Sequence, residues 1–164
     1  MRRSLFPPRT ALIITLALAL IGSLFVQTGS AETQEERDAR MQWWREARFG
    51  MFVHWGLYSG LAGTWNDKPV GTRGGMEWIQ QRVRVDTWEY AHQAVPEFRP
   101  AEGFAKEWAK LAKEAGCRYV VFTTKHHDGF GLFDSQYTTY DAHDLVGRDL
   151  CKETTDAIRD EGLK

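Results

Sequence analysis

The sequence predicts an α/β fold, namely the amino-terminal portion of a (β/α)8 TIM-like barrel that is incomplete in this chain. Residues 49–56 and 119–124 are short apolar segments, which is typical of buried parallel strands. Helical patterns follow each of them, and the alternation of strand and helix predicts a parallel sheet with right-handed crossovers. A complete barrel takes ~250 residues, so two strands and their helices correspond to about its first quarter.

The first helix is predicted over residues 33–48. Acidic side chains gather near its amino end, where the helix dipole favours them, and Met41, Trp44 and Ala47 form an apolar stripe. The strand at residues 49–56 follows directly and closes on a histidine, a tryptophan and a glycine.

A long connection spans residues 57–100. Connections of this length are uncommon in compact domains, and they are usually functional or contain short elements of their own. We expect one short helix at residues 76–83 and another at residues 85–95, capped by Asp86 or Thr87.

The most regular helical pattern starts after Pro100 and ends at Gly116, a residue type that favours the position after a helix. Its charged side chains lie on one face and its apolar side chains on the other. The predicted buried face consists of Phe104, Trp108, Leu111, Ala112 and Ala115.

The second strand is predicted at residues 119–124. Its continuous apolar run, without polar alternation, predicts burial on both faces. A loop over residues 129–147 follows, then a helix at 149–161, and a third strand is expected to begin at residues 163–164. The helix turns three apolar side chains inward: Leu150, Ala157 and Ile158.

Residues 1–31 have the pattern of a signal peptide, with a positively charged leader, an apolar run and a small-residue cleavage motif. The apolar run, residues 11–26, is short of the ~20 residues that span a bilayer, although an uncleaved anchor is the alternative. We therefore expect an exported protein, periplasmic or extracellular, whose mature part is residues 32–164 and is not held in a membrane.

The composition of the mature part argues against nucleic acid as a partner. Loss of three arginines lowers the net charge from −1 to −4, and no basic stripe is present. Seven tryptophans remain, which indicates either a large core or platforms on which sugar rings pack, and the core is the default for any single one. Nothing in the sequence indicates a cofactor, and the oligomeric state is left open.

The two cysteines, Cys117 and Cys151, are expected to be free thiols. Export permits a disulfide, but Cys117 begins the second strand and Cys151 begins the helix after its far end. The length of the strand separates them by more than the ~7 Å between Cα atoms that a disulfide allows.

Histidines follow both strands: His54 after the first, and His126 with His127 after the second. Parallel strands meet at their carboxyl ends, so we expect the three imidazoles to lie close together and to offer hydrogen bonds to a polyol or sugar. The alternative is one buried structural histidine and one loop residue. We predict no metal site, because adjacent strand residues point to opposite faces and no other ligand motif is present.

Three carboxylates are candidates for chemistry: Glu77, Asp128 and Asp134. Glycoside hydrolysis needs two carboxyl groups, ~5 Å apart if the configuration is retained, and nothing in the spacing brings two of these together. Asp128 precedes a glycine and is more typical of a turn. Trp55 and Trp78 are sugar platforms or core residues.

Three motifs, FGMFVHWGLYS, GGMEW and YVVFTTKHHDGFGLFDS, closely resemble in order and separation the amino-terminal part of glycoside hydrolase family 29. The resemblance covers residues 43–164. It implies a retaining α-L-fucosidase with a (β/α)8-type catalytic barrel, which acts on a fucosylated oligosaccharide or glycoconjugate.

The resemblance also implies roles for individual residues. His54, His126 and His127 would contact the fucose hydroxyls. Glu77 would lie in the sugar pocket, and in some members of the family this glutamate has been considered for the acid/base role. Trp78 would form part of the pocket wall.

The resemblance places the catalytic nucleophile, an aspartate after the fourth barrel strand, beyond Lys164. We therefore expect the 164-residue chain alone to be inactive. Two alternatives stay open: a non-catalytic fucose-binding module, and a barrel hydrolase that acts on another sugar.

Overall fold

The computed structural model describes residues 31–71 and 74–164. The predicted signal peptide, residues 1–31, therefore lies outside the described residues except for its last position. The chain divides into two units, Met1–Gln42 and Trp43–Lys164, and each is described by itself. Among the described residues, none of the helices has the length and apolarity that a membrane crossing requires.

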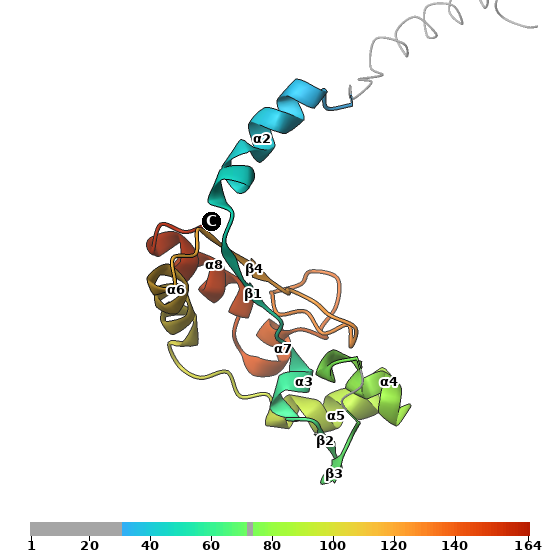
Figure 1. The fold of residues 1–164 in the computed structure, drawn as a ribbon. Coiled ribbons are helices and arrows are strands. Elements are labelled where there is room, and N and C mark those ends of the chain that lie inside the picture. The colour runs from blue at the N-terminus through green and yellow to red at the C-terminus, as the bar shows by residue number, and fades with distance from the viewer. Residues whose placement is uncertain (1–30, 72–73) are drawn as a thin grey trace, which may run out of the picture. The chain divides into compact units, whose positions relative to one another are not determined.

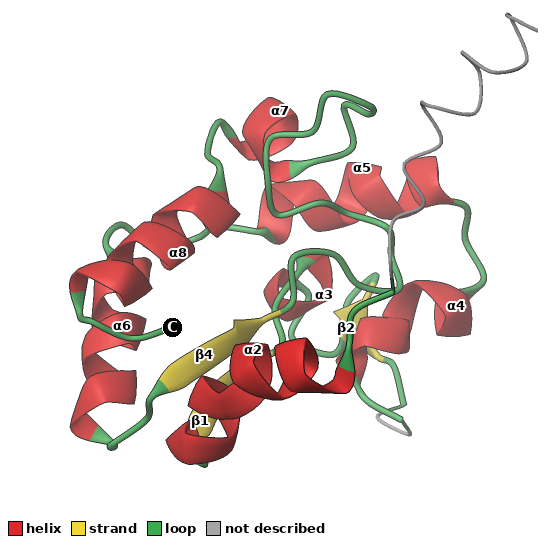
Figure 2. Ribbon diagram, turned by 90° about the horizontal axis from the view of Figure 1, so that it is seen from above, coloured by secondary structure: helices red, strands yellow, loops and turns green. Residues whose placement is uncertain are grey.

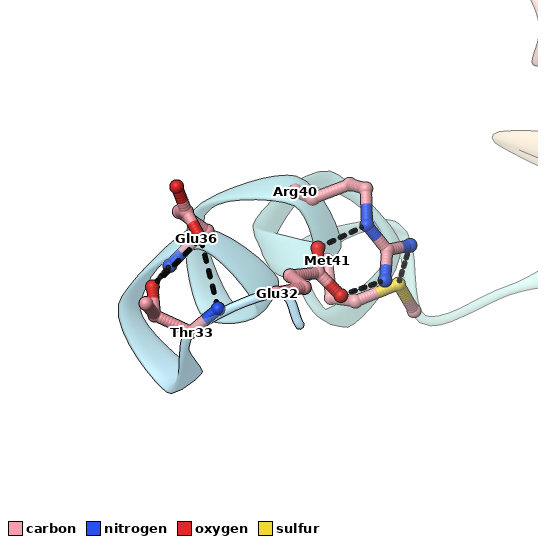
Figure 3. Close-up of polar contacts among 5 residues, drawn as sticks. All are labelled: Glu32, Thr33, Glu36, Arg40 and Met41. Carbon is pink, nitrogen blue, oxygen red and sulfur yellow. Dashed lines mark hydrogen bonds and ion pairs between the residues drawn. The ribbon is translucent and has the colours of Figure 1, made fainter. Parts of the chain in front are cut away.

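The described part of the first unit contains the start of helix α2, Gln34–Ala47, which confirms the predicted first helix. Thr33 and Glu36 form a capping box (Figure 3): the Glu36 amide donates to the Thr33 Oγ1 at 3.2 Å, and the Thr33 amide donates to the Glu36 Oε2 at 2.8 Å. The Thr33 bonds lower the pKa of Glu36. Arg40 donates two hydrogen bonds to Glu32, at 2.7 and 2.9 Å.

The second unit is built on a two-stranded parallel sheet of β1, Gly50–Val53, and β4, Tyr119–Phe122 (Figure 1). Gly50 lies opposite Tyr119 and Val53 opposite Phe122. Both predicted strands and their parallel pairing are confirmed.

The edge of β4 that faces away from β1 is hydrogen-bonded to Lys164, the last residue of the sequence. The Val120 amide donates to the Lys164 carbonyl at 2.7 Å, and the Lys164 amide donates to the Arg118 carbonyl at 3.2 Å. This is the pattern of a parallel ladder. Residue 164 thus pairs where the sequence predicts that a third strand begins.

Helices α6, Phe104–Glu114, and α8, Leu150–Asp160, pack side by side (Figure 2). Asp149 caps α8 by accepting a hydrogen bond from the Lys152 amide at 2.8 Å. The predicted inward side chains of α8 are buried, and Thr154 is buried with them; its hydroxyl donates to the Leu150 carbonyl at 2.7 Å.

The predicted buried face of α6 is wrong in part. Leu111 is 58% exposed and Ala115 is exposed, whereas Ala105 and Ala109 are buried together with Phe104 and Ala112. Apolar residues on this helix form two overlapping stripes, and the stripe with the small alanines faces the core because small side chains let neighbouring elements approach closely.

The prediction that β4 is buried on both faces is also wrong for this chain. Met51, Val120 and Phe122 pack against the core. On the opposite face, Phe52 is 61% exposed and its pairing partner Val121 is 43% exposed. Side chains alternate along a strand, and on this second face the Trp43 ring packs edge-on against Tyr119 at 6.1 Å while Phe52 and Val121 stay exposed.

The connection between β1 and α6 lies beyond the carboxyl ends of the strands (Figure 1) and contains the two predicted short helices. The first is a 3-10 turn η1, Met76–Trp78, which continues as α4, Ile79–Val83. The second is α5, Thr87–Glu97, where Asp86 is the cap and accepts from the Glu89 amide at 2.9 Å.

Four short elements were not predicted. Helix α3, Leu57–Gly60, directly follows the histidine-tryptophan-glycine segment after β1. Strands β2, Thr64–Trp65, and β3, Lys68–Pro69, form a hairpin whose two turn residues both have positive φ, as a tight hairpin turn requires. Helix α7, Ala142–Val146, lies inside the expected loop and is capped by the buried Asp141.

Cys117 and Cys151 are free, which confirms the prediction. Burial raises the pKa of the Cys151 thiol to about 12. A thiol with so high a pKa carries little thiolate at neutral pH and is therefore a weak nucleophile.

Candidate functional site

The three predicted histidines lie together at the carboxyl ends of the sheet. His54 comes directly after β1, and His126 and His127 follow β4. The ring centroids of His54 and His126 are 5.2 Å apart, and those of His126 and His127 are 4.5 Å apart. The Tyr58 ring packs edge-on against His126 at 5.8 Å.

A hydrogen bond determines which nitrogen of His126 carries the proton. The backbone N–H of His127 donates to the His126 Nδ1 at 2.9 Å, so Nδ1 is an acceptor and the neutral ring carries its proton on Nε2. Burial lowers the pKa of His126, and the neighbouring His127 and His54 lower it further. His126 therefore offers a neutral ring with one N–H donor to a ligand.

Glu77 and Trp78 come to the same site from η1. The indole of Trp78 stacks on the imidazole of His127 with centroids 3.7 Å apart and planes inclined by 28°. The Glu77 carboxylate folds back over Gly75, where a Cβ would collide with both carboxylate oxygens. Gly75 also has φ +94°, so only glycine leaves this space to the carboxylate without strain.

Arg82 holds the glycine-rich backbone in front of η1. Its Nη1 donates to the Gly71 carbonyl at 2.5 Å, and its Nη2 donates to the Gly75 carbonyl at 2.6 Å. Charged hydrogen bonds of this length are among the stronger ones in proteins. Arg82 thereby fixes the backbone over which the Glu77 carboxylate lies.

A cavity of about 420 Å³ opens beside these residues. Glu77, Trp78 and His127 form one part of its lining. Residues of α4 and the turn after it complete the lining: Gln80, Gln81, Arg84 and Val85.

Trp55 and Trp78 were each expected to be either a sugar platform or a core residue, and Trp55 is a core residue. Its ring lies 4.8 Å from that of Phe104 and 5.0 Å from that of Trp108, within the aromatic cluster under the sheet. Its backbone amide donates to the Thr123 Oγ1 at 2.9 Å. Trp55 thus ties the end of β1 to the end of β4, whereas Trp78 lines the cavity.

Asp128 is a buried turn residue, and Asp134 pairs with His143 rather than with His54, His126 or His127. The Gly129 amide donates to the His126 carbonyl at 3.0 Å, and the Asp128 Oδ1 accepts from the Phe130 amide at 3.2 Å. Asp134 is exposed, with a carboxylate oxygen 3.5 Å from the His143 Nδ1.

Within the described residues, no group of three or more histidine, cysteine, aspartate or glutamate side chains has the arrangement of a metal site.

Comparison with known proteins identifies the family. The α-L-fucosidase family model matches residues 23–164. The chain belongs to the α-L-fucosidase family. Its fold is accordingly mixed α/β, as in the fucosidase structures that it resembles.

Named relatives of this fucosidase-family chain include both curated proteins and solved structures. Plasma α-L-fucosidase of Homo sapiens is 31% identical over 144 residues, which are 77% of this chain and 29% of the relative. Tissue α-L-fucosidase of Rattus norvegicus is 36% identical over 131 residues, 75% of this chain and 28% of the relative. The chain thus spans less than a third of these two curated relatives.

Two solved bacterial structures share this part of the fold. A family 29 α-L-fucosidase from Bacteroides thetaiotaomicron, trapped as a covalent intermediate, is 42% identical with a TM-score of 0.70 and covers 77% of this chain and 29% of its own. The α-L-fucosidase AlfC of Lactobacillus casei is 37% identical with a TM-score of 0.70, over 77% of this chain and 39% of its own.

A set of four buried polar side chains in this fucosidase-family chain was not predicted from the sequence. The hydroxyls of Tyr90 and Tyr140 and the Oδ2 of Asp128 are buried without a hydrogen-bond partner among the described residues, and the hydroxyl of Tyr58 is buried beside Thr123. Burial raises the pKa of each of these tyrosines, that of Tyr58 to about 12, and the Asp128 charge contributes to all three. These positions are scattered over 83 residues, from Tyr58 to Tyr140, so no local pattern could have revealed them.

The burial of Asp128 predicts a measurable pH dependence. Asp128 is 4% exposed, and burial raises the pKa of its carboxyl to about 6. The folded state therefore binds this proton more tightly than the unfolded state, and stability falls as pH rises from about 4 towards 6. Replacing Asp128 by asparagine is expected to raise the free energy of unfolding at pH 8 by up to about 2–3 kcal/mol. The melting temperature should rise accordingly.

The same substitution should have little effect at pH 4, where the carboxyl is protonated in the folded state. Thermal unfolding of wild type and Asp128→Asn across pH 4–8 checks this. Equal differences at both ends of the range would contradict the ionisation of a buried Asp128.

Proposed function

We propose that this chain provides the fucose-binding part of an exported, retaining α-L-fucosidase that releases fucose from fucosylated glycans. The main support is the convergence of the three histidines, His54, His126 and His127, with Trp78 stacked on His127. His127, Trp78 and Glu77 line one cavity. Imidazoles, a carboxylate and an aromatic face are together the groups that bind a hydroxylated ring with one apolar face.

In the proposed mechanism, a carboxylate attacks C1 of fucose while a second carboxyl group protonates the departing glycosidic oxygen. Water then attacks C1 of the covalent intermediate and releases fucose with its configuration retained. The histidines hold the ring hydroxyls, and their hydrogen bonds strengthen as the ring distorts towards the transition state. Glu77 is a ligand of the sugar and a weak candidate for the acid/base; the nucleophile is proposed to lie in sequence beyond Lys164.

We further propose that the sheet is the beginning of a (β/α)8 barrel. The face of the sheet that packs against the core corresponds to the outside of a barrel, which helices cover. The opposite face, with the exposed Phe52 and Val121, would then point into the barrel interior. The pairing of Lys164 with β4 supports a further parallel strand at that edge.

Two alternatives make different predictions. A non-catalytic fucose-binding module must fold with the apolar face of its sheet in water, and the exposure of Phe52 and Val121 counts against this. A hydrolase for another sugar would use the same histidines but would not prefer fucose, because hydrogen bonds alone do not determine which hydroxyls are axial.

The proposal predicts where activity is found. The protein expressed from its complete reading frame is expected in the exported fraction, with its mature amino terminus near Glu32, and is expected to hydrolyse nitrophenyl α-L-fucoside. NMR of the first product should show the α-anomer, as retention requires. The 164-residue chain alone should show no turnover.

The outcomes separate the alternatives. Equal hydrolysis of a nitrophenyl galactoside would favour another sugar. Fucose binding by a folded 164-residue chain, without turnover by any longer form, would favour the binding module. Robust turnover by the 164-residue chain would contradict the placement of the nucleophile beyond Lys164.

A further inference from the structure

We propose that Gln81 and Arg84 form a binding subsite for the sugar that carries the fucose. This inference rests on the proposed function and names the side chains that would recognise the leaving group. The two residues line the same cavity as Glu77, Trp78 and His127.

The cavity adjoins only one of the three histidines. His127 and Trp78 line it, whereas His54 and His126 do not. If the fucose ring is held among the three histidines, its glycosidic bond can lead into the cavity past Trp78. The side chains along that path are those of α4 and the turn after it.

Arg84 has an unusual backbone conformation for its residue type. It follows α4 with φ 59° and ψ 39°, and its amide donates to the Gln80 carbonyl at 3.0 Å. Glycine is the usual residue at such a left-handed position after a helix, and an arginine there is strained.

The side chains of Arg84 and Gln81 are available to a ligand. Both residues are exposed, and within the described part of the chain neither side chain makes a hydrogen bond or ion pair. The neighbouring Gln80 differs, because its amide donates to the Thr87 Oγ1 at 3.4 Å. Arg84 and Gln81 thus supply free donors at the cavity wall.

The rest of the wall fits a second sugar ring. Val85 and the Trp78 indole offer apolar surface to the C–H face of a pyranose, while the guanidinium and the amide can donate to its hydroxyl or acetamido oxygens. A nitrophenyl group offers fewer acceptors to the same donors. The subsite should therefore distinguish a glycan from an artificial aryl fucoside.

The test compares Arg84→Gly with Arg48→Gly in the protein expressed from its complete reading frame. Arg48 is a matched control: it also follows a helix with a left-handed φ, 57°, and it is exposed, but it does not line the cavity. Glycine suits both backbones, so neither change should unfold the protein. For each variant, kcat/KM is measured for a fucosyl-N-acetylglucosamine disaccharide and for nitrophenyl fucoside.

The ratio of the two kcat/KM values, disaccharide over nitrophenyl fucoside, is expected to fall about tenfold in Arg84→Gly, the effect of one lost charged hydrogen bond. In Arg48→Gly the ratio should equal that of wild type. Gln81→Ala should also lower this ratio. If Arg84→Gly is poorly folded, the ratio in Gln81→Ala tests the subsite instead. A wild-type ratio in both cavity variants would overturn the subsite. Absence of any wild-type hydrolysis would instead refute the proposed function.

Discussion

Replacing Gly75 by alanine is expected to lower kcat/KM for a fucoside by about 100-fold. The added Cβ would occupy the space of the Glu77 carboxylate, so Glu77 must leave its position over the glycine. Misplacement of a substrate-binding group by about 1 Å is enough for a loss of this size. Steady-state kinetics with nitrophenyl fucoside, on the protein expressed from its complete reading frame, measure it.

The neighbouring Gly74 supplies the control. Gly74 also has positive φ, +85°, so alanine is strained there to a similar degree. Its Cβ would meet only ordinary contacts, 3.7 Å from the Arg82 Nη2 and 3.9 Å from the Trp78 Cδ1. Gly74→Ala should therefore lower melting temperature about as much as Gly75→Ala but reduce kcat/KM far less. Equal kinetic losses would mean that backbone strain, and not the position of Glu77, controls activity.

The gathering of the three histidines could be predicted because it depends on a general property of parallel sheets. His54 and His126 each follow a strand, and the carboxyl ends of paired parallel strands lie at one edge. Strand and helix periodicity is local, so most element positions could be predicted too. The helix caps at Asp86 and Asp149 follow the same local rules.

The support for Glu77 could not be predicted, because it depends on the path of an irregular, glycine-rich segment. Neither the packing of the Glu77 carboxylate against Gly75 nor the two hydrogen bonds from Arg82 produces a periodic pattern in the sequence. The choice between the two stripes of α6 likewise depended on what packs against it. Burial of Asp128 beside three tyrosines required long-range contacts that only the folded chain reveals.

Replacing His126 by asparagine is expected to lower kcat/KM for a fucoside about 30-fold, which corresponds to a loss of about 2 kcal/mol. The asparagine oxygen can take the place of Nδ1 and still accept the hydrogen bond from the His127 amide. It cannot supply the Nε2–H donor. The substitution therefore separates sugar binding from the structure of the turn.

The pH dependence of the same variant tests the state of His126. Its pKa is lowered in the folded protein, first by burial, so the neutral form is favoured and the stability it contributes is present above the ordinary pKa of about 6.5. That contribution is lost as pH falls through the lowered pKa, where protonation of Nδ1 breaks the bond from the His127 amide. His126→Asn does not titrate and should lose stability less steeply than wild type in this acidic range.

A leucine at position 126 removes both the donor and the acceptor. It should match His126→Asn in the loss of kcat/KM but fall below it in melting temperature at pH 7, because the His127 amide loses its partner. Wild-type kinetics in His126→Asn would remove His126 from the sugar site. Equal melting temperatures for the two variants would show that the Nδ1 bond contributes nothing to the turn; burial and the neighbouring His127 and His54 would then account for the lowered pKa of His126.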